Sequence, residues 1–555
     1  MNYQRYKRMP VVEIKDRQWP DRVIEHAPQW CSVDLRDGNQ ALVEPMNVKE
    51  KMEMFDLLVR LGFKEIEIGF PSSSQIEYDF LRELVRRNMI PDDVTIQILC
   101  QCREHLIERS FEAIQGVKNV IFHIYNSTST LQRDVVFHMS KEEIRQIAVD
   151  GTRMVKERLS QFDGNLTLEY SPESFSGTEM EYALEVCTAV QEEWNYASGD
   201  KIIFNLPNTV EQTTPNVHAD QIEWMNRHFK DRDRVILSVH PHNDRGTAIA
   251  ATELALLAGA DRVEGTLFGN GERTGNVDIL AVAYNMFSQG VDPQLNIENV
   301  REITEVYERC CKMQIDPRHP YAGKLVFTAF SGSHQDAINK GMHAMYERKN
   351  PYWEIPYLPI DPADIGREYE PVVRINSQSG KGGVAFVMES LYGFRLPKGM
   401  QREFADVIQL ISEKQGGEVS PDQIFAAFQD EYIALDNPFE FVRIRVTDLD
   451  DTDDDRVSVE VEFKYDGELL RVSAEGNGPL DAAKAAIRTK VDVDVSVLDY
   501  SEHAMGEGSH ARAAAYIQMR NNRTGKEIFG AGDSHNITKA TMRAYFSALN
   551  RVVKE

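Results

Sequence analysis

The first half of the chain repeats one alternation of apolar and polar positions. Short β-rich runs end in polar residues, and a helical pattern follows each run. The runs are CSVDL (31–35), EIEIGF (65–70), TIQIL (95–99), NVIFHIY (119–125), LTLEY (166–170), KIIFNL (201–206), RVILSVH (234–240) and DRVEGTLF (261–268). Strands that alternate with helices pair in parallel through crossovers, and eight such strands close a barrel. The pattern therefore predicts an α/β fold with a (β/α)8 TIM barrel over residues 31–330, after an N-terminal extension over residues 1–30.

An open, doubly wound sheet is the structural alternative to the barrel. That fold carries a G-x-G-x-x-G turn after its first strand, and no such turn follows residues 31–35 here. The polar loops after the eight runs are instead the feature that a barrel enzyme uses, because the chemistry of such enzymes gathers at the C-terminal rim of the strands.

The pattern changes after the barrel. Residues 331–435 are mostly helical and predict linker subdomains, with one loop-rich passage from residue 350 to residue 383. An irregular segment this long in a compact protein is often a lid or a subunit contact. We therefore expect this passage to serve as a lid or as a subunit contact.

The last part of the chain contains a tandem repeat. The strand patterns at 441–446, 457–465 and 469–476 and the helix at 479–490 recur in the same order between residues 491 and 551. In this alignment Gly476-Asn477-Gly478 matches Gly530-Ala531-Gly532. Residues 436–555 therefore predict a separate α+β domain built from two βββα units with internal two-fold symmetry.

Composition excludes several classes of function. The 555 residues carry a formal charge of −26, which argues against a nucleic-acid binder, since phosphate backbones are met by Lys and Arg. No apolar run approaches the ~20 residues of a membrane span, and the N-terminus has no signal-peptide pattern. The six cysteines lack paired C-x-x-C spacing, so we expect reduced thiols and a cytoplasmic location.

A candidate metal site follows from His240-Pro241-His242 at the end of the seventh run. Residues i and i+2 of an extended chain share a face, so both imidazoles point into the barrel mouth. Buried or capping histidines explain a lone H-x-H pattern equally well. Here Asp37 lies just past the first run, which neighbours the eighth in a closed barrel, and Asn276 lies past the eighth. Two His, one Asp and an amide suit a divalent ion such as Mg²⁺, Mn²⁺ or Zn²⁺.

Further polar residues face the same rim. Arg36 beside a metal would offset charge that develops on a carbonyl oxygen. An ion pair between Arg36 and Glu272 is the structural alternative, and the two roles are compatible. Glu173 and Thr209 follow the fifth and sixth runs, and helix capping or turn formation is their alternative role.

These residues lie in motifs that closely resemble the 2-isopropylmalate synthase family in its long form. This family belongs to a superfamily of metal-dependent barrels with homocitrate synthase, citramalate synthase and hydroxymethylglutaryl-CoA lyase. The motifs are DLRDGNQ (34–40), GFPSSSQ (69–75), EYSPES (169–174), NLPNTVE (205–211), VHPHNDRG (239–246), GNGERTGN (269–276), FSGSHQDAINKG (330–341) and INSQSGKGG (375–383). The resemblance extends over nearly the whole chain, including the tandem repeat.

The resemblance implies a Claisen-type acyltransferase of leucine biosynthesis. Such an enzyme converts acetyl-CoA, 2-oxoisovalerate and water into 2-isopropylmalate and CoA, with a divalent metal and with K⁺ as an activator. The implied metal ligands are Asp37, His240, His242 and Asn276. The implied substrate-binding residues are Thr209 for the carboxylate, with Glu173, Ser171, His123, Leu99 and Asn205. Arg36 would bind the keto oxygen, and Glu272 would hold Arg36 and the acetyl end.

The resemblance also implies a dimer and its regulation. His334 and Tyr357 are the implied proton-transfer residues, and they would reach into the partner's site in a domain-crossed homodimer. Residues 436–555 would bind leucine as an allosteric inhibitor. Gly476, Gly478, Gly530 and Gly532 are our candidates for lining the effector site, with ordinary strand-to-helix turns as the alternative.

Other readings of the same residues remain open at this point. Citramalate synthase, which takes pyruvate, is the closest rival. Homocitrate synthase would need a cationic group where this chain has Leu99, and the lyase would need no sensor domain. A barrel that has lost its chemistry is a third class, which the Asp37, His240 and His242 set disfavours.

Overall fold

The computed structural model describes residues 2–7, 9–195, 200–329, 331–369, 381–415, 419–449, 456–506 and 510–554. The chain divides into two compact units. The first comprises Met1–Val326 and Ile360–Glu368, and the second comprises Phe327–Pro359 and Tyr369–Glu555. The motif at residues 375–383 lies mostly outside the described residues.

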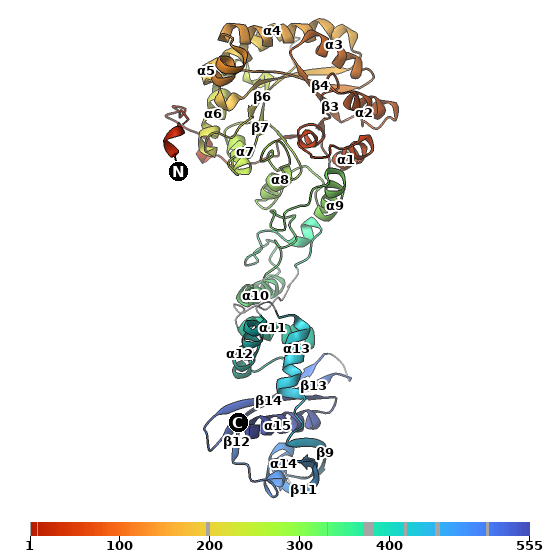
Figure 1. The fold of residues 1–555 in the computed structure, drawn as a ribbon, viewed down its shortest axis with the longest axis vertical. Helices are drawn as coiled ribbons and strands as arrows, with labels where there is room; N and C mark the ends of the chain where they lie inside the picture. Colours follow the sequence, from red (N-terminus) through yellow and green to blue (C-terminus); the bar gives the residue numbers. More distant parts are fainter. Residues whose placement is uncertain are drawn as a thin grey trace. The chain divides into compact units, whose positions relative to one another are not determined.

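Eight parallel strands of the first unit close into a barrel in chain order, so the predicted fold class is confirmed (Figure 1). The first and last strands pair in register, with Trp30 opposite Val263. The strands are β1 (Gln29–Ser32), β2 (Glu65–Glu67), β3 (Thr95–Gln101), β4 (Asn119–Ser127), β5 (Asn165–Glu173), β6 (Ile202–Asn208), β7 (Val235–Pro241) and β8 (Arg262–Gly265).

Helices surround this barrel and bury their apolar faces against it. For example, Asn47 and Glu50 form a capping box at the start of the first helix, which buries Met54, Phe55 and Leu58. The helices are α1 (Val48–Arg60), α2 (Gln75–Arg86), α3 (Glu104–Ala113), α4 (Lys141–Arg158), α5 (Met180–Trp194), α6 (Pro215–His228), α7 (Ala248–Leu257), α8 (Ile279–Phe287) and α9 (Val300–Cys311).

The end of the first strand differs from the prediction. We expected a strand to Leu35, but β1 ends at Ser32 and a short π-helix, η3 (Asp34–Gly38), follows. The side chain of Asp34 accepts hydrogen bonds from Ser32 Oγ at 2.7 Å and from the backbone N–H of Leu267 at 3.1 Å. These contacts turn the chain back over the barrel mouth, and residues 36 and 37 lie in this turn.

The second unit begins with the predicted helical region. Its helices are α10 (Gly332–Arg348), α11 (Lys381–Tyr392), α12 (Lys398–Gln415) and α13 (Pro421–Phe428). No helix within the described ranges is long and apolar enough to cross a membrane. The six cysteines of the chain are free thiols, and only Cys102 is not fully buried.

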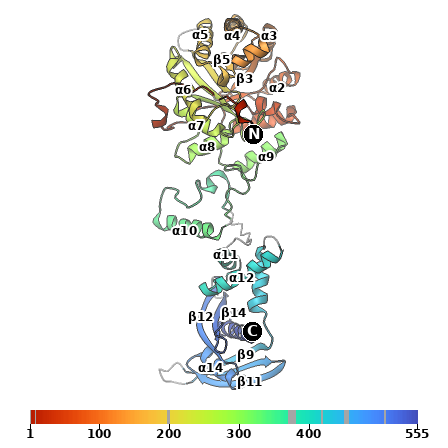
Figure 2. The same cartoon turned by 60° about the vertical axis from the view of Figure 1, so that its left-hand side comes forward.

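The tandem repeat is confirmed in the C-terminal part of this unit (Figure 2). Each copy forms its own three-stranded antiparallel sheet followed by a helix. The first copy holds β9 (Phe439–Asp448), β10 (Val457–Tyr465), β11 (Glu468–Gly476) and α14 (Pro479–Arg488). The second holds β12 (Val495–Met505), β13 (Arg512–Asn521), β14 (Glu527–Ser534) and α15 (Ile537–Lys554).

The two copies share one apolar core, and the second copy also packs on the linker helices. Val461, Ile487, Ile517 and Phe546 from both copies belong to the shared core. A separate cluster joins Tyr516 and Phe529 of the second sheet to side chains of α11, α12 and α13. The tandem repeat and helices α11, α12 and α13 therefore form one continuous structure within the second unit.

Candidate functional site

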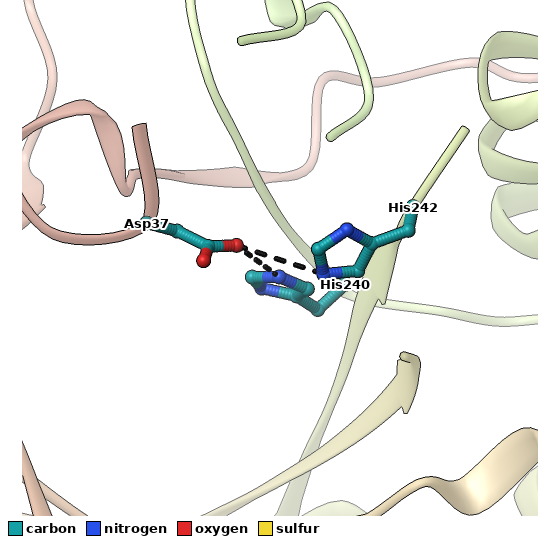
Figure 3. Close-up of side chains that lie close together, drawn as sticks. All are labelled: Asp37, His240 and His242. Atoms are coloured by element: carbon teal, nitrogen blue, oxygen red, sulfur yellow. Dashed lines mark hydrogen bonds and ion pairs between the residues drawn. The ribbon is translucent and has the colours of Figure 1, made fainter. Parts of the chain in front are cut away.

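Three side chains converge at the mouth of the barrel in a geometry that suits a metal ion. Asp37 projects from η3, and His240 and His242 come from the end of β7 (Figure 3). Asp37 Oδ2 lies 3.2 Å from His240 Nε2 and 3.6 Å from His242 Nε2. All three residues are buried, and their ligand atoms lie within 4.8 Å of one another. The i, i+2 spacing on β7 therefore brings the two imidazoles to one face as expected.

The charges around this cluster prepare it for a cation. Burial alone would raise the pKa of Asp37, but the Arg36 guanidinium and His240 outweigh burial and hold it well below its usual range. Burial and the charge of His240 lower the pKa of His242 to about 3, so this imidazole is neutral at pH 7. Burial opposes protonation of His240 as well, yet hydrogen bonds to Asp37 and Glu264 raise its pKa to about 9. A metal ion that binds here therefore displaces a proton from His240.

Asn276 supplies an acceptor of the kind that a fourth ligand requires. Its side chain is 1% exposed, and its Nδ2 donates to the carbonyl of Asn270 at 3.0 Å. Its Oδ1 is buried without a hydrogen-bond partner among the described atoms. The backbone of Asn276 pairs with that of His242 in an isolated antiparallel bridge, so the two residues are neighbours at the barrel mouth. Since buried acceptors are normally satisfied, this donor set fits a divalent ion.

Arg36 is held by carboxylates, but not by the one that the sequence suggested. Its Nη1 lies 3.0 Å from Asp37 Oδ1, and its Nε donates to Glu67 on β2. Glu272, the expected partner, instead accepts from Gln40 Nε2 at 3.2 Å. Glu67 faces the barrel interior below Arg36, whereas Glu272 lies on a partly exposed loop. The predicted Arg36–Glu272 pair is therefore wrong, and Glu67 takes its place.

A cavity of about 340 Å³ opens above this cluster. Most of the predicted barrel residues line it. These are Arg36, Asp37, Leu99, His123, Ser171, Glu173, Asn205, Thr209, His240, His242 and Glu272. Phe70, Tyr125, Pro207 and Arg273 also line the cavity and were not predicted. Phe70, Leu99 and Pro207 give the cavity apolar surface, and Arg36 and Thr209 give it groups that can bind an anion.

The hydroxyl of Thr209 is oriented by the backbone. Its Oγ1 accepts from the N–H of Ser174 at 2.9 Å, and Ser174 has a left-handed backbone with φ +59°. The Thr209 proton therefore remains available for donation to a ligand in the cavity. Glu173, the residue before Ser174, accepts a short hydrogen bond from Ser127 Oγ, which fixes the carboxylate at the rim.

Sequence reasoning missed a layer of buried charged and polar residues at the base of the cavity. Glu67, Gln97, Glu169, Arg262 and Glu264 point into the barrel, and all are fully buried. Barrel interiors are usually filled by branched apolar residues. The sequence does contain a signal for this layer. Charged and apolar residues alternate in EIEIG (65–69) and DRVEG (261–265), and this alternation places the charged residues on the inner face of the barrel.

His334 and Tyr357 belong to the second unit. Their rings stack with centroids 4.0 Å apart, and Tyr357 is 62% exposed with φ +66°. His334 lies in the first turn of α10 and is also exposed. The two predicted proton-transfer residues therefore form one exposed pair.

A second cavity, of about 570 Å³, lies between the two copies of the C-terminal repeat. Gly478, at the start of α14, lines it together with Val497, Tyr500, Thr541 and Met542. The four predicted glycines do not share this position. Gly476 ends β11, where an added Cβ would lie 2.6 Å from Ala482 N, and Gly530 and Gly532 lie in β14 directly beneath α15.

Three family models match successive parts of the chain. The HMGL-like model matches residues 27–306. The alpha-isopropylmalate synthase post-catalytic domain-like model matches residues 324–389. The LeuA allosteric (dimerisation) domain model matches residues 418–553.

Similar proteins match over the full length. A 2-isopropylmalate synthase from Clostridium acetobutylicum is 53% identical over 556 residues, which is 99% of each chain. A protein of the same name from Agrobacterium fabrum is 52% identical, and the match covers 99% of this chain and 98% of the similar protein. Another from Mycobacterium ulcerans is 53% identical, and the match covers 97% of each chain.

Proposed function

The chain belongs to the 2-isopropylmalate synthase family, and from this we propose that it condenses acetyl-CoA with 2-oxoisovalerate and water to give 2-isopropylmalate and CoA. The observation that carries the proposal is the convergence of Asp37, His240 and His242 beside Arg36 under one cavity. The new carbon–carbon bond forms between the acetyl methyl carbon and the keto carbon, and water then cleaves the thioester.

Asp37, His240, His242 and Asn276 would hold a divalent ion, which when bound supplies Lewis-acid polarisation of the keto group. Mg²⁺, Mn²⁺ and Zn²⁺ all suit this mixture of oxygen and nitrogen ligands. Activation by K⁺ and a cytoplasmic location remain predictions.

The residues of the cavity would bind and orient the oxo acid. Arg36 keeps one face toward the cavity while Asp37 and Glu67 fix its other side, so its charge is held where negative charge grows on the keto oxygen. Thr209 would donate its free proton to the substrate carboxylate. Leu99 and Pro207 would pack on the isopropyl group of the substrate. His123, Ser171 and Asn205 would lie below this group.

His334 and Tyr357 would move protons in the partner's active site. The two side chains are exposed and stack on each other, which supports contact with a molecule or subunit outside their own helical region. The match of residues 418–553 to a dimerisation domain supports a homodimer in which the pair crosses to the other subunit. One residue would remove the methyl proton, and the other would help activate the hydrolytic water.

We propose that leucine binds in the cavity between the C-terminal repeats and lowers turnover. The N-terminal ends of α14 and α15 border this cavity, and helix N-termini favour a carboxylate. Val497 and Met542 offer apolar contacts for the leucine side chain, and the missing side chain of Gly478 leaves room for a ligand. Inhibition then requires two states of the enzyme with different leucine affinity.

The test measures free thiol released from acetyl-CoA by the full chain, with 2-oxoisovalerate, pyruvate and 2-oxoglutarate in parallel, with and without leucine. We expect 2-oxoisovalerate to be preferred and leucine to inhibit. Asp37→Asn serves as the control without a complete metal site and should release no thiol above background. A preference for pyruvate would replace the proposed substrate, because the two acids differ by only ~1–3 kcal/mol per methylene in a hydrophobic pocket.

A further inference from the structure

The carboxylate of Glu264 lies directly beneath the metal-binding histidine His240. Glu264 is on β8 and is fully buried. Its Oε2 accepts from His240 Nδ1 at 2.8 Å and from Asn205 Nδ2 at 3.0 Å. Its Oε1 accepts from Gln97 Nε2 at 2.7 Å and from Arg262 Nη1 at 2.9 Å. Four groups therefore donate to this one carboxylate, which fills its accepting capacity.

This contact decides which nitrogen of His240 is free. An ionised carboxylate can only accept, so Nδ1 of His240 carries the proton that it donates to Glu264. Once a metal has displaced the second proton of the ring, the lone pair is therefore on Nε2, the atom that faces Asp37 in Figure 3. His242 has no such partner, since its Nδ1 is buried without a hydrogen bond in the described part of the chain. One of the two histidines is therefore oriented from below, and the other is not.

We propose that Glu264 is the positioning residue of the metal site and fixes the ring and tautomer of His240. The inference rests on the proposed metal-dependent function. Metal-ligating histidines commonly need such a carboxylate, and its loss costs ~10–100-fold in metal affinity. Of the two histidines at the metal site, the effect falls on His240, because this is the one that donates a hydrogen bond to Glu264.

Arg262 keeps the Glu264 carboxylate in place. It is fully buried below the site, and each of its nitrogens has a partner. Nη1 also donates to Ser238 Oγ at 2.8 Å, Nη2 donates to Gln97 at 2.6 Å, and Nε donates to Glu65 at 2.5 Å. A buried carboxylate without a cation would be strongly disfavoured, so Arg262 is what allows a charge at this depth. The barrel floor is thus a fixed polar support for His240.

A second metal ion at this depth is the competing explanation. Glu67, His123 and Glu264 offer ligand atoms within 4.8 Å of one another. However, Glu67 already accepts from Arg36 and Gln97, and Glu264 accepts from Arg262 and His240. Two guanidinium groups beside these oxygens repel a further cation, so the geometry favours positioning over metal binding.

Glu264→Gln tests the proposal, with Glu65→Gln as its matched control. Glu65 pairs with the same Arg262 but is not among the residues that line the cavity. The amide that Glu264→Gln introduces would turn an N–H group toward groups that are themselves donors. We expect Mn²⁺ to bind the full-length Glu264→Gln protein ~10–100-fold more weakly, and excess Mn²⁺ to restore part of its activity. Glu65→Gln should bind Mn²⁺ as the wild type does.

Thermal unfolding without metal checks that both variants fold. Glu264→Asp is the second variant if Glu264→Gln does not fold, because it keeps the charge beside Arg262 but shortens the reach to His240. Its Mn²⁺ affinity should fall between those of the wild type and Glu264→Gln. Wild-type Mn²⁺ affinity in a folded Glu264 variant would overturn the inference. Wild-type Mn²⁺ affinity in Asp37→Asn would instead overturn the proposed metal site itself.

Discussion

Alanine at Gly530 and alanine at Gly478 should impair leucine control in two different ways. The sequence pattern gave both glycines the same role, because they mark equivalent loops of the repeat. In the structure Gly530 lies in β14 beneath α15, whereas Gly478 lines the cavity between the repeats. The first substitution should therefore act on packing and the second on the effector site.

The size of the first effect follows from the distance between β14 and α15. A Cβ at Gly530 would lie under 3.0 Å from the backbone of Ala544 and Ala548. Backbone atoms of a helix cannot rotate away, so α15 must shift from the sheet. Such overpacking costs ~1–3 kcal/mol. Each kcal/mol lowers the melting temperature by roughly 2–4 °C in a unit as large as the second one, to which the repeat belongs.

The second effect should leave packing intact. Gly478 has φ +143°, which side-chain-bearing residues rarely adopt, and no described atom lies within 4 Å of its added Cβ. Strain of ~1–3 kcal/mol would then move the loop that borders the cavity. Since 1.4 kcal/mol is tenfold in affinity, leucine should bind about 5- to 140-fold more weakly if this strain falls on the leucine-bound state.

Thermal unfolding, leucine calorimetry and leucine inhibition of thiol release separate the two effects. Gly525→Ala is the control, because Gly525 has φ +74° and open space around it but lies in a turn away from the cavity. We expect Gly525→Ala to keep wild-type leucine affinity. The reasoning fails if Gly530→Ala melts at the wild-type temperature, or if Gly478→Ala binds leucine normally.

Three further predictions concern the barrel. Asp37→Asn should weaken Mn²⁺ binding by more than ~10²-fold and abolish thiol release. Metal analysis of the purified variant measures the loss of Mn²⁺, and normal turnover of the variant would contradict the prediction. Arg36→Gln should lower kcat and kcat/KM together by ~10²–10³, as steady-state kinetics would reveal, whereas a change in KM alone would mean that Arg36 only binds substrate. His319 lies 2.8 Å from Asp278; burial opposes its protonation, but this hydrogen bond raises its pKa above 6.5. The pair therefore stabilises the fold fully below pH 6.5, and this contribution is lost as the pH rises through the raised pKa. His319→Gln should thus lower the free energy of unfolding, measured in urea, by ~1.5–3 kcal/mol at pH 6 and by less at pH 9. A difference in unfolding free energy between variant and wild type that does not change with pH would refute the assignment.

The sequence by itself determined the barrel, the tandem repeat and the metal triad. These features depend on local periods: a strand alternates every two residues, and the polar residues that end parallel strands meet at one rim. His240 and His242 lie on one face for this reason, and Asp37 joins them because the first and last strands of a closed barrel are neighbours. The C-terminal repeat was visible because the same order of elements occurs twice.

Only the tertiary structure decided which buried charges meet. Arg36 pairs with Glu67 rather than with Glu272, and Glu264 supports His240 from below. In the sequence Glu67 and Glu264 are charges within short, mostly buried strands, and the partners that they meet depend on how far the strands are staggered around the barrel. The different roles of Gly478 and Gly530 likewise depend on tertiary structure, because Gly530, unlike Gly478, lies against the backbone of a helix. A sequence pattern specifies the face on which a side chain lies, but contact distances between segments far apart in the chain arise only when the whole fold closes.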